Sequence, residues 1–305
     1  MKPCLSWMKI TLALAAASLA WMPLAASAAE TEMTIATSDG ARTAIILPAG
    51  QGPRPTVIVL HGELMPVRFA IEQSGFAGEA ASAGFTAVFP EGRMLRWHDG
   101  RTGGWDGPDD AGFLRVLIAR LIASRVALPG HIYLAGISSG GMMTFAMACK
   151  AGDLLRGIGT VIALMPAGIA PCDPPPMPVV MINATGDPVM PIDGGNMGML
   201  GEAGSVWSAK RTAELFVSRN GCEASAARAV PARGAWDGTS VTEISWSRCS
   251  YHKPVTLYRI NGGGHQIAGH SAILPLLLGR STRDISAAHA IMSAFAREEA
   301  GEEEL

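Results

Sequence analysis

Apolar runs alternate with amphipathic stretches along most of the chain, and this alternation predicts strands that alternate with helices. Residues 33–38 and 41–47 alternate between apolar and polar positions on either side of Asp39-Gly40, a dipeptide that favours a two-residue β-hairpin turn. Continuously apolar runs, typical of parallel strands covered on both faces, occur at residues 56–60, 85–89, 131–135, 160–165, 179–183 and 255–260. Helical periodicity predicts helices at about residues 69–82, 111–123, 140–150, 205–220 and 283–299. The pattern therefore predicts an α/β fold with a mostly parallel central sheet flanked by helices.

Residues 223–254 have the least regular pattern, and we predict an insertion with a hairpin there. The pattern shows no internal repeat and no inserted cap domain. We therefore expect a single domain at residues 29–305, with any site open to solvent.

The first 28 residues have the pattern of a signal peptide. Lys2 and Lys9 give a positive start, an apolar stretch follows, and Ala26-Ser27-Ala28 forms a small-residue cleavage site. No later stretch reaches the roughly 18 uninterrupted apolar residues of a membrane span. We therefore expect the mature chain to be exported, either secreted or periplasmic, and not to be held in a membrane.

Four cysteines follow the predicted signal peptide, namely Cys149, Cys172, Cys222 and Cys249. An even number in an oxidising compartment suggests two disulfides, for which the sequence allows three pairings. We favour Cys149–Cys172 and Cys222–Cys249 because each closes a short loop, and four unpaired buried thiols are the alternative. The chain has no C-x-x-C pair and no His/Cys cluster, so neither a zinc site nor a redox motif is indicated.

The charge balance gives no sign of a nucleic-acid partner or of an anionic membrane. The precursor carries a net charge of −2, which becomes −4 when the two lysines of the signal peptide are removed. The oligomeric state is left open by the sequence.

The five residues from Gly136 to Gly140 place Ser138 between the predicted strand 131–135 and the predicted helix 140–150. A serine with glycine two positions away on either side, between a strand and a helix, is typical of the nucleophile elbow of an α/β-hydrolase. Small neighbours are needed because the backbone and the helix crowd this strained turn. The motif alone is weak in a chain with 36 glycines, but its setting strengthens it. We therefore predict that Ser138 is the nucleophile of an enzyme that cleaves acyl bonds.

A serine hydroxyl needs a base, and the base needs a carboxylate that orients it. His265 lies in a glycine-rich loop after the last apolar strand, which makes it the predicted base. Asp187 follows the strand at 179–183 and is the predicted acid, because the order in this fold is serine, acid, histidine. Asp193, six residues further on, is the rival. Either aspartate could instead cap its own backbone in a turn.

The tetrahedral intermediate of acyl transfer carries an oxyanion that needs two preorganised donors. One predicted donor is the backbone N–H of Ser139, and the other is the backbone N–H of Glu63, where Gly62 would let the chain turn inward. The carboxylate of Glu63 would oppose the oxyanion unless it points away or pairs. The alternative for His61-Gly62 is a simple turn at the end of a strand.

Six segments occur in one order along the chain, namely LHG after a strand, DDAGFLRVLI, GISSGGMMT, GDPVMPIDG, RNGC and GGGHQIAG. This ordered set resembles the secreted esterases related to polyhydroxybutyrate depolymerases, feruloyl esterases and acetylxylan esterases, a group like carbohydrate esterase family 1. The resemblance covers residues from roughly 35 to 275 and implies a triad of Ser138, Asp187 and His265. It also implies an oxyanion hole that includes the loop after Gly62, and ester hydrolysis without cofactor or metal, and it supports the two disulfides.

The chain departs from this family in the loops around the predicted site. The segment LHGELM stands where relatives commonly read like LHGCGQ, and Gln266-Ile267-Ala268 replaces a Thr-Trp-Pro segment after the histidine. The lost tryptophan puts polyester binding in doubt. Trp97 and Trp105 could supply an aromatic surface for the substrate instead, and the alternative is that both are packed anchors of their loop.

These observations predict an exported serine esterase that works through an acyl-enzyme on an ester substrate that could be polymeric. The ester could belong to a polyhydroxyalkanoate, a feruloylated or acetylated polysaccharide, or a short-chain acid. One alternative is a serine peptidase on the same fold. Another is a catalytically inactive carbohydrate- or polyester-binding homologue, which would have a misaligned triad and which the carboxylate of Glu63 favours.

Overall fold

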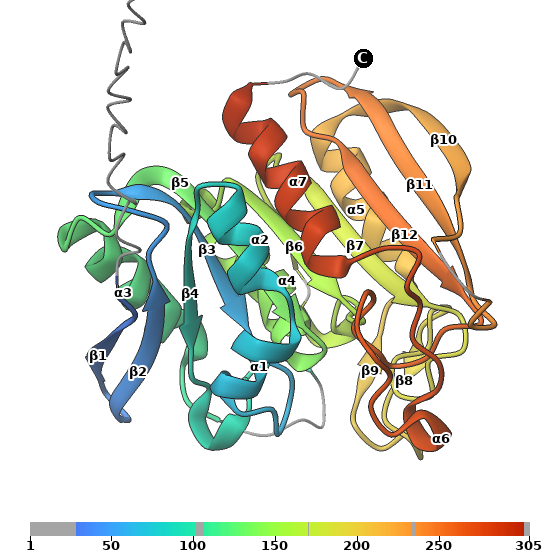
Figure 1. The fold of residues 1–305 in the computed structure, drawn as a ribbon, viewed down its shortest axis with the longest axis horizontal. Coiled ribbons are helices and arrows are strands. Elements are labelled where there is room, and N and C mark those ends of the chain that lie inside the picture. Colours follow the sequence, from blue (N-terminus) through green and yellow to red (C-terminus); the bar gives the residue numbers. More distant parts are fainter. Residues whose placement is uncertain (1–28, 102–106, 170, 234–235, 302–305) are drawn as a thin grey trace, which may run out of the picture.

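The computed structural model describes residues 29–101, 107–169, 171–233 and 236–301. The predicted signal peptide and Trp105 lie outside these ranges. A ten-stranded sheet with the order β1-β2-β4-β3-β5-β6-β7-β12-β11-β10 runs through the molecule (Figure 1). Its strands are β1 (Thr31–Thr37), β2 (Gly40–Leu47), β3 (Arg54–Leu60), β4 (Thr86–Pro90), β5 (Ala127–Ile137), β6 (Gly157–Val161), β7 (Val179–Ala184), β10 (Cys222–Val230), β11 (Ser240–Cys249) and β12 (Val255–Asn261). Two short strands, β8 (Gly195–Asn196) and β9 (Ser205–Val206), pair separately.

The six central strands, from β4 to β12 in the sheet order, are parallel, and two antiparallel strands flank them on each side. Four of these strands, β3, β4, β6 and β7, are almost entirely buried, as their continuously apolar sequences predict. The sheet order, the parallel centre and the helices on both faces are those of the α/β-hydrolase fold predicted from the sequence. Residues 223–254 are not an insertion, because β10 and β11 form a hairpin that pairs with β12 and extends the main sheet.

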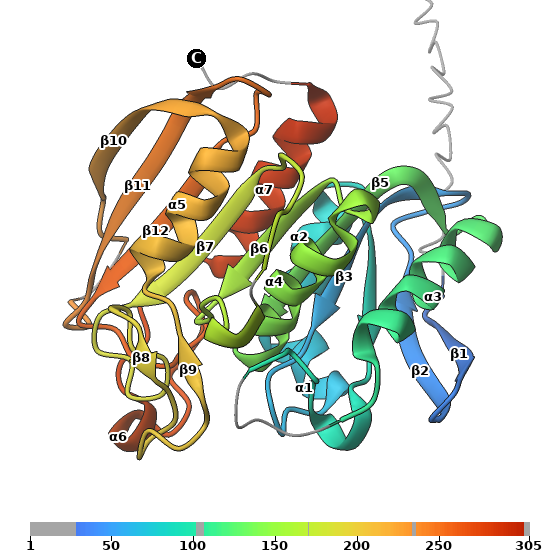
Figure 2. The ribbon, with the colours of Figure 1, turned by 180° about the vertical axis from the view of Figure 1, so that it is seen from behind.

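Helices cover both faces of this sheet. In Figure 1 the helices α1, α2 and α7 lie in front of it, and Figure 2 shows α3, α4 and α5 on the opposite face. Each face has its own buried apolar cluster, so the sheet separates two cores. The helices are α1 (Val67–Gln73), α2 (Phe76–Ser82), α3 (Asp110–Ala123), α4 (Ser139–Ala151), α5 (Ala209–Asn220), α6 (Pro275–Leu278) and α7 (Ala287–Ala300). Within the described ranges, no helix is both long and apolar enough to cross a bilayer.

Four local predictions were wrong. The strand expected at 160–165 lies at Gly157–Val161, and residues 205–206, expected to be helical, form β9 ahead of α5. The other two differ for reasons of backbone conformation. The hairpin turns at Ser38-Asp39 rather than at Asp39-Gly40, because Thr37 pairs with Gly40 in the ladder. The single helix expected at 69–82 is two helices, since Gly75 has a φ of 78° and breaks the helical path between α1 and α2.

The structure contains the two disulfides that the sequence favoured, Cys149–Cys172 and Cys222–Cys249. The first links the end of α4 to the loop before β7, and the second joins β10 to β11. Each closes a short loop, with sequence separations of 23 and 27 residues. In the chain-entropy account, crosslinks of this length stabilise a fold by roughly 3 kcal/mol each.

Candidate active site

Ser138 lies between the end of β5 and the start of α4, at the carboxyl edge of the parallel strands. Its φ of 53° and ψ of −119° form a strained turn that a non-glycine residue rarely adopts. The flanking glycines are sterically required. A Cβ on Gly136 would lie 2.2 Å from the carbonyl oxygen of Gly140, and a Cβ on Gly140 would lie 2.4 Å from that of Leu60. The local sequence therefore forms the elbow because only glycine fits at both positions.

The structure brings together the three side chains that the sequence singled out for the triad. The Ser138 hydroxyl lies 2.9 Å from Nε2 of His265, at the distance of a hydrogen bond. Nδ1 of His265 donates to Oδ2 of Asp187 at 2.8 Å, and the side chain of Asp187 is 1 % exposed. The three residues come from the ends of β5, β7 and β12. This continuous chain of hydrogen bonds lets the imidazole accept the serine proton while a carboxylate stabilises the charge that develops on the ring.

Asp187 also caps its own backbone in a turn, the alternative role that the sequence left open for Asp187 and Asp193. Its Oδ1 accepts hydrogen bonds from the backbone N–H groups of Val189 and Met190, both at 2.8 Å. One carboxylate oxygen thus fixes the loop, and the other faces His265. The rival Asp193 is exposed and has no contact with His265 among the described hydrogen bonds.

The two predicted oxyanion donors lie beside Ser138. The N–H of Ser139 is at the first position of α4, where a helix leaves its N–H groups without an intrahelical acceptor. No described residue accepts a hydrogen bond from the N–H of Glu63. The next two N–H groups are both engaged, since Leu64 donates to the carbonyl oxygen of Leu95 and Met65 donates to that of Gly62. Both donors are therefore available to a bound carbonyl oxygen.

His61 fixes the peptide that carries the second donor. Its Nδ1 donates to the carbonyl oxygen of Gly62 at 2.7 Å, and its Nε2 accepts from the backbone N–H of Gly92 at 2.9 Å. Because a trans peptide is planar, holding the Gly62 carbonyl on one side directs the Glu63 N–H to the other. Burial lowers the pKa of His61, so the ring stays neutral and can both donate and accept. From the sequence, His61 was considered only as part of a turn, and this positioning role was missed.

The expected role of Gly62 needs a correction. Gly62 does not have a positive φ, whereas Leu64 has a φ of 59° and makes the turn. A Cβ on Gly62 would meet only ordinary contacts, 3.6 Å from Cβ of Ser138. The glycine therefore leaves space beside the nucleophile instead of providing backbone freedom.

The carboxylate of Glu63 is paired. Its two oxygens lie 3.2 Å from Nε of Arg96 and 3.5 Å from the guanidinium of Arg101. Arg101 in turn forms a fork with the buried Asp99, whose side chain is 1 % exposed. The two arginines therefore balance the negative charge that the sequence placed beside the oxyanion site. The sequence analysis did not identify Arg96, Asp99 or Arg101 as functional residues. The only signal for such a network was that these three charged residues stand close together in the segment RWHDGR.

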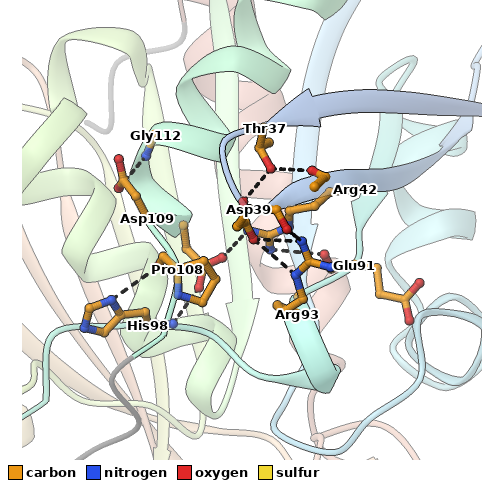
Figure 3. A network of polar contacts seen from close by, with 12 residues as sticks. Thr37, Asp39, Arg42, Glu91, Arg93, His98, Pro108, Asp109 and Gly112 are labelled. Atoms are coloured by element: carbon orange, nitrogen blue, oxygen red, sulfur yellow. Dashed lines mark hydrogen bonds and ion pairs between the residues drawn. The ribbon is translucent and has the colours of Figure 1, made fainter.

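Buried polar groups hold the segment 96–101, which carries Arg96 and Arg101. Asp110 forms a buried ion pair with Arg42 and accepts from the backbone N–H of His98. Figure 3 shows the contact of His98 with the carbonyl oxygen of Pro108, together with the contacts of Arg93 to Asp39 at the β1–β2 turn. At the start of α3, Asp109 caps the helix and Asp110 forms this anchor.

Trp97 does not provide a surface for the substrate. It is 2 % exposed, its Nε1 donates to the carbonyl oxygen of His61 at 2.9 Å, and its ring packs against that of His61. Its burial makes it a packed anchor of the loop, the alternative that the sequence left open. Trp105 lies outside the described residues.

A cavity of about 420 Å³ opens at Ser138 and His265. Its lining is mostly aliphatic and comes from the loop after β3, from α1, from the residues beside Ser138 and from residues 265–278. Among the described residues, no group of three or more His, Cys, Asp or Glu side chains is arranged to hold a metal ion. The site thus joins the Ser138 hydroxyl, the His265 imidazole, two N–H donors and an apolar pocket.

No family model matches the chain. It is 27 % identical over 254 residues to NocK of Nocardia uniformis subsp. tsuyamanensis, a protein assigned provisionally as an esterase, and the match covers 79 % of this chain and 73 % of NocK. It is 26 % identical over 202 residues to feruloyl esterase B of Piromyces equi, covering 61 % of this chain but only 36 % of that protein.

Among solved structures, an acetyl xylan esterase from Aspergillus awamori matches with a TM-score of 0.56 at 12 % identity, covering 77 % of this chain and 94 % of that one. This likeness shows a shared fold. The esterase names of the sequence relatives, with the α/β-hydrolase fold, support an ester hydrolase.

Proposed function

We propose that the protein is an exported serine esterase that hydrolyses carboxylic esters through a covalent acyl-enzyme. Ser138 is the nucleophile, His265 is the general base and acid, and Asp187 orients His265. The observation that carries the proposal is the unbroken chain of hydrogen bonds from Asp187 through His265 to Ser138, at the mouth of an apolar pocket. The relatives named as esterases support the same reaction class.

In the first half of the reaction, Ser138 Oγ attacks the ester carbonyl carbon while its proton passes to Nε2 of His265. The negative charge moves to the carbonyl oxygen, where the N–H groups of Glu63 and Ser139 stabilise it. The imidazolium then protonates the alcohol oxygen as its bond to carbon breaks, which releases the alcohol and leaves the acyl group on Ser138. A water molecule repeats the sequence with His265 as base and releases the acid.

Two features support export. The first 28 residues have a signal-peptide pattern, and the structure contains two disulfides, which form and persist in oxidising compartments. The ordered motifs and the esterase names of the relatives support membership of the group that includes polyhydroxybutyrate depolymerases, feruloyl esterases and acetylxylan esterases. The pairing of Glu63 with Arg96 and Arg101 removes the feature that favoured an inactive homologue.

The test is labelling with a fluorophosphonate probe together with hydrolysis of para-nitrophenyl acetate. We expect the mature protein to be labelled and active, and Ser138→Ala to lose both properties. The matched variant Ser139→Ala keeps its backbone N–H and should still be labelled. Labelling that survives Ser138→Ala would assign the nucleophile elsewhere, and faster cleavage of a matched amide than of the ester would favour a peptidase.

A further inference from the structure

The pocket beside Ser138 has a chemical character that restricts the acyl group. Besides Ser138 and His265, its polar side chains are Glu63 and Gln266. The Glu63 carboxylate pairs with two arginines. The remaining wall consists of Gly62, Pro66 and the side chains Leu64, Met65, Phe69, Ile137, Ile162, Ile267, Ile273, Leu274 and Leu278.

Gln266 is fully engaged within the protein. Its Nε2 donates to the carbonyl oxygens of Ile273 at 2.7 Å and of Gly279 at 3.0 Å, and its Oε1 accepts from the N–H of Ile273 at 2.9 Å. Its amide therefore closes the loop that carries α6 and has no free donor for a ligand. Outside the reacting groups and the arginine-paired carboxylate of Glu63, the pocket's side chains offer only apolar surface.

Polar acyl groups and very small ones both fit this pocket badly. Away from Glu63, the phenol of a cinnamoyl group would be buried against apolar side chains without a hydrogen-bond partner, which costs free energy. An acetyl group would leave most of the 420 Å³ unfilled, and that volume lies in the lower part of the range of roughly 300–1,000 Å³ for small-molecule sites. A flexible saturated chain fills the space and matches the wall.

We propose that the pocket binds the saturated aliphatic chain of the acyl group, so that the preferred substrates are esters of fatty acids of medium length, about four to eight carbons. This inference rests on the proposed function of the same site. The pocket is assigned to the acyl chain for two reasons. Ile137 and Ile162 line the pocket and flank Ser138. After the alcohol leaves, only the acyl group stays bonded to Ser138.

The experiment measures kcat/KM for para-nitrophenyl acetate, butanoate, hexanoate and octanoate. Each methylene that enters the pocket should raise kcat/KM roughly fourfold until the chain reaches the end of the cavity. We therefore expect hexanoate to exceed acetate by at least about tenfold. A methyl ferulate assay should give the lowest value.

Variants at α6 test whether the named pocket causes this preference. Leu278 lines the pocket, so Leu278→Ser should lower the ratio of hexanoate to acetate by about threefold or more. Leu276, on the same helix, is fully exposed and does not line the pocket, so Leu276→Ser should leave the ratio unchanged. Phe69→Ser, on the opposite wall, gives a second variant if Leu278→Ser unfolds, as judged from the melting temperature.

The outcomes separate the two proposals. If no ester is cleaved and the probe does not label Ser138, the proposed function fails. If esters are cleaved but acetate or ferulate is the best substrate, only the acyl-chain inference fails. It also fails if lengthening the alcohol of an alkyl acetate series, rather than the acyl chain, raises kcat/KM.

Discussion

The pocket has two walls that are built in different ways. The oxyanion wall, residues 61–69 with the segment 92–101 behind it, is held by side-chain charges and by buried His61 and Trp97. The histidine wall, residues 264–279, contains no Lys, Arg, Asp or Glu. It is held by main-chain hydrogen bonds, such as that from the N–H of His265 to Leu278, and by the amide of Gln266.

The difference corresponds to what each wall must do. In the proposed mechanism the oxyanion wall holds one N–H group at a fixed place, and a network of ion pairs and buried rings restrains that peptide from several directions. The histidine wall has to hold one ring toward Asp187 and otherwise offers an aliphatic surface, with Leu274 63 % exposed. Fixed geometry and an adaptable apolar surface are thus supplied by separate segments.

The largest expected effect is on the histidine wall. In Asp187→Asn the amide can no longer accept the Nδ1–H of His265 as a charged partner, so the tautomer and the imidazolium are both disfavoured. We expect kcat to fall by about 10⁴-fold. Asp193→Asn, the matched control, should change kcat by less than about twofold, because this side chain is exposed and removed from the ring. The reverse result would make Asp193 the acid and would contradict the assignment of His265 and its partner Asp187 to the histidine wall.

A smaller effect is expected on the oxyanion wall. Arg101→Ala removes one partner of Glu63 and leaves the carboxylate of Asp99 buried and unpaired. We expect kcat to fall by about 10- to 100-fold, because the Glu63 peptide loses its support, and stability to fall by about 3 kcal/mol. Arg101→Lys keeps the charge but not the fork and should lie in between.

The control for that measurement is Arg93→Ala. Arg93 lies on the same segment, but it pairs with Asp39 at the β1–β2 turn, has no ion pair with Glu63 and does not line the pocket. It should change kcat by less than about twofold. Equal effects of the two alanine variants on kcat would mean that the ion pairs do not act on the oxyanion wall.

The buried His61 should make the stability of the oxyanion wall depend on pH. Because its pKa is lowered in the folded state, the unfolded chain binds the proton more readily. Its contribution to stability is complete above about pH 6.5 and is lost as the pH falls through the folded-state value. Chemical denaturation should therefore show His61→Gln less stable than the native protein at pH 8, with the difference shrinking toward pH 5. A difference that grows on acidification would contradict a neutral buried ring.

The smallest expected effect comes from salt. Raising the ionic strength from 0.1 to 1 M shortens the Debye length from about 10 to about 3 Å. The pair of Glu63 with Arg96 is partly exposed, so we expect a loss of kcat below about twofold. Arg96→Gln should remove this salt response, whereas a variant of the uncharged histidine wall such as Leu276→Ser should keep it. A salt response that persists in Arg96→Gln would mean that this ion pair is not its source.

The features that depend on neighbouring residues were predictable from the sequence. Apolar runs identified the central strands, and the order of strand ends brought Ser138, Asp187 and His265 to one edge of the sheet. The elbow was predictable because two glycines near Ser138 are required by contacts within a few residues and with the adjoining strand.

What depends on contacts between distant segments was not predictable. The break at Gly75 gives no signal in the apolar periodicity, because both halves of the predicted helix bury residues toward the same core. The support of Glu63 by Arg101, and the burial of Trp97 on His61, join residues more than 30 positions apart. A single sequence contains no pattern that pairs such residues.

The crosslink between Cys222 and Cys249 has a consequence for association. These cysteines oppose each other directly in the ladder at the start of β10, the outermost strand of the sheet. An outermost strand presents unpaired backbone groups to which another chain can add, and β10 is largely exposed with mostly small side chains. By fastening β10 to β11 at one end, the disulfide keeps this edge strand from fraying into a free template for aggregation. Because this crosslink lies outside the pocket, we expect its loss in Cys222→Ser to lower the protein's solubility while the lining of the pocket stays intact.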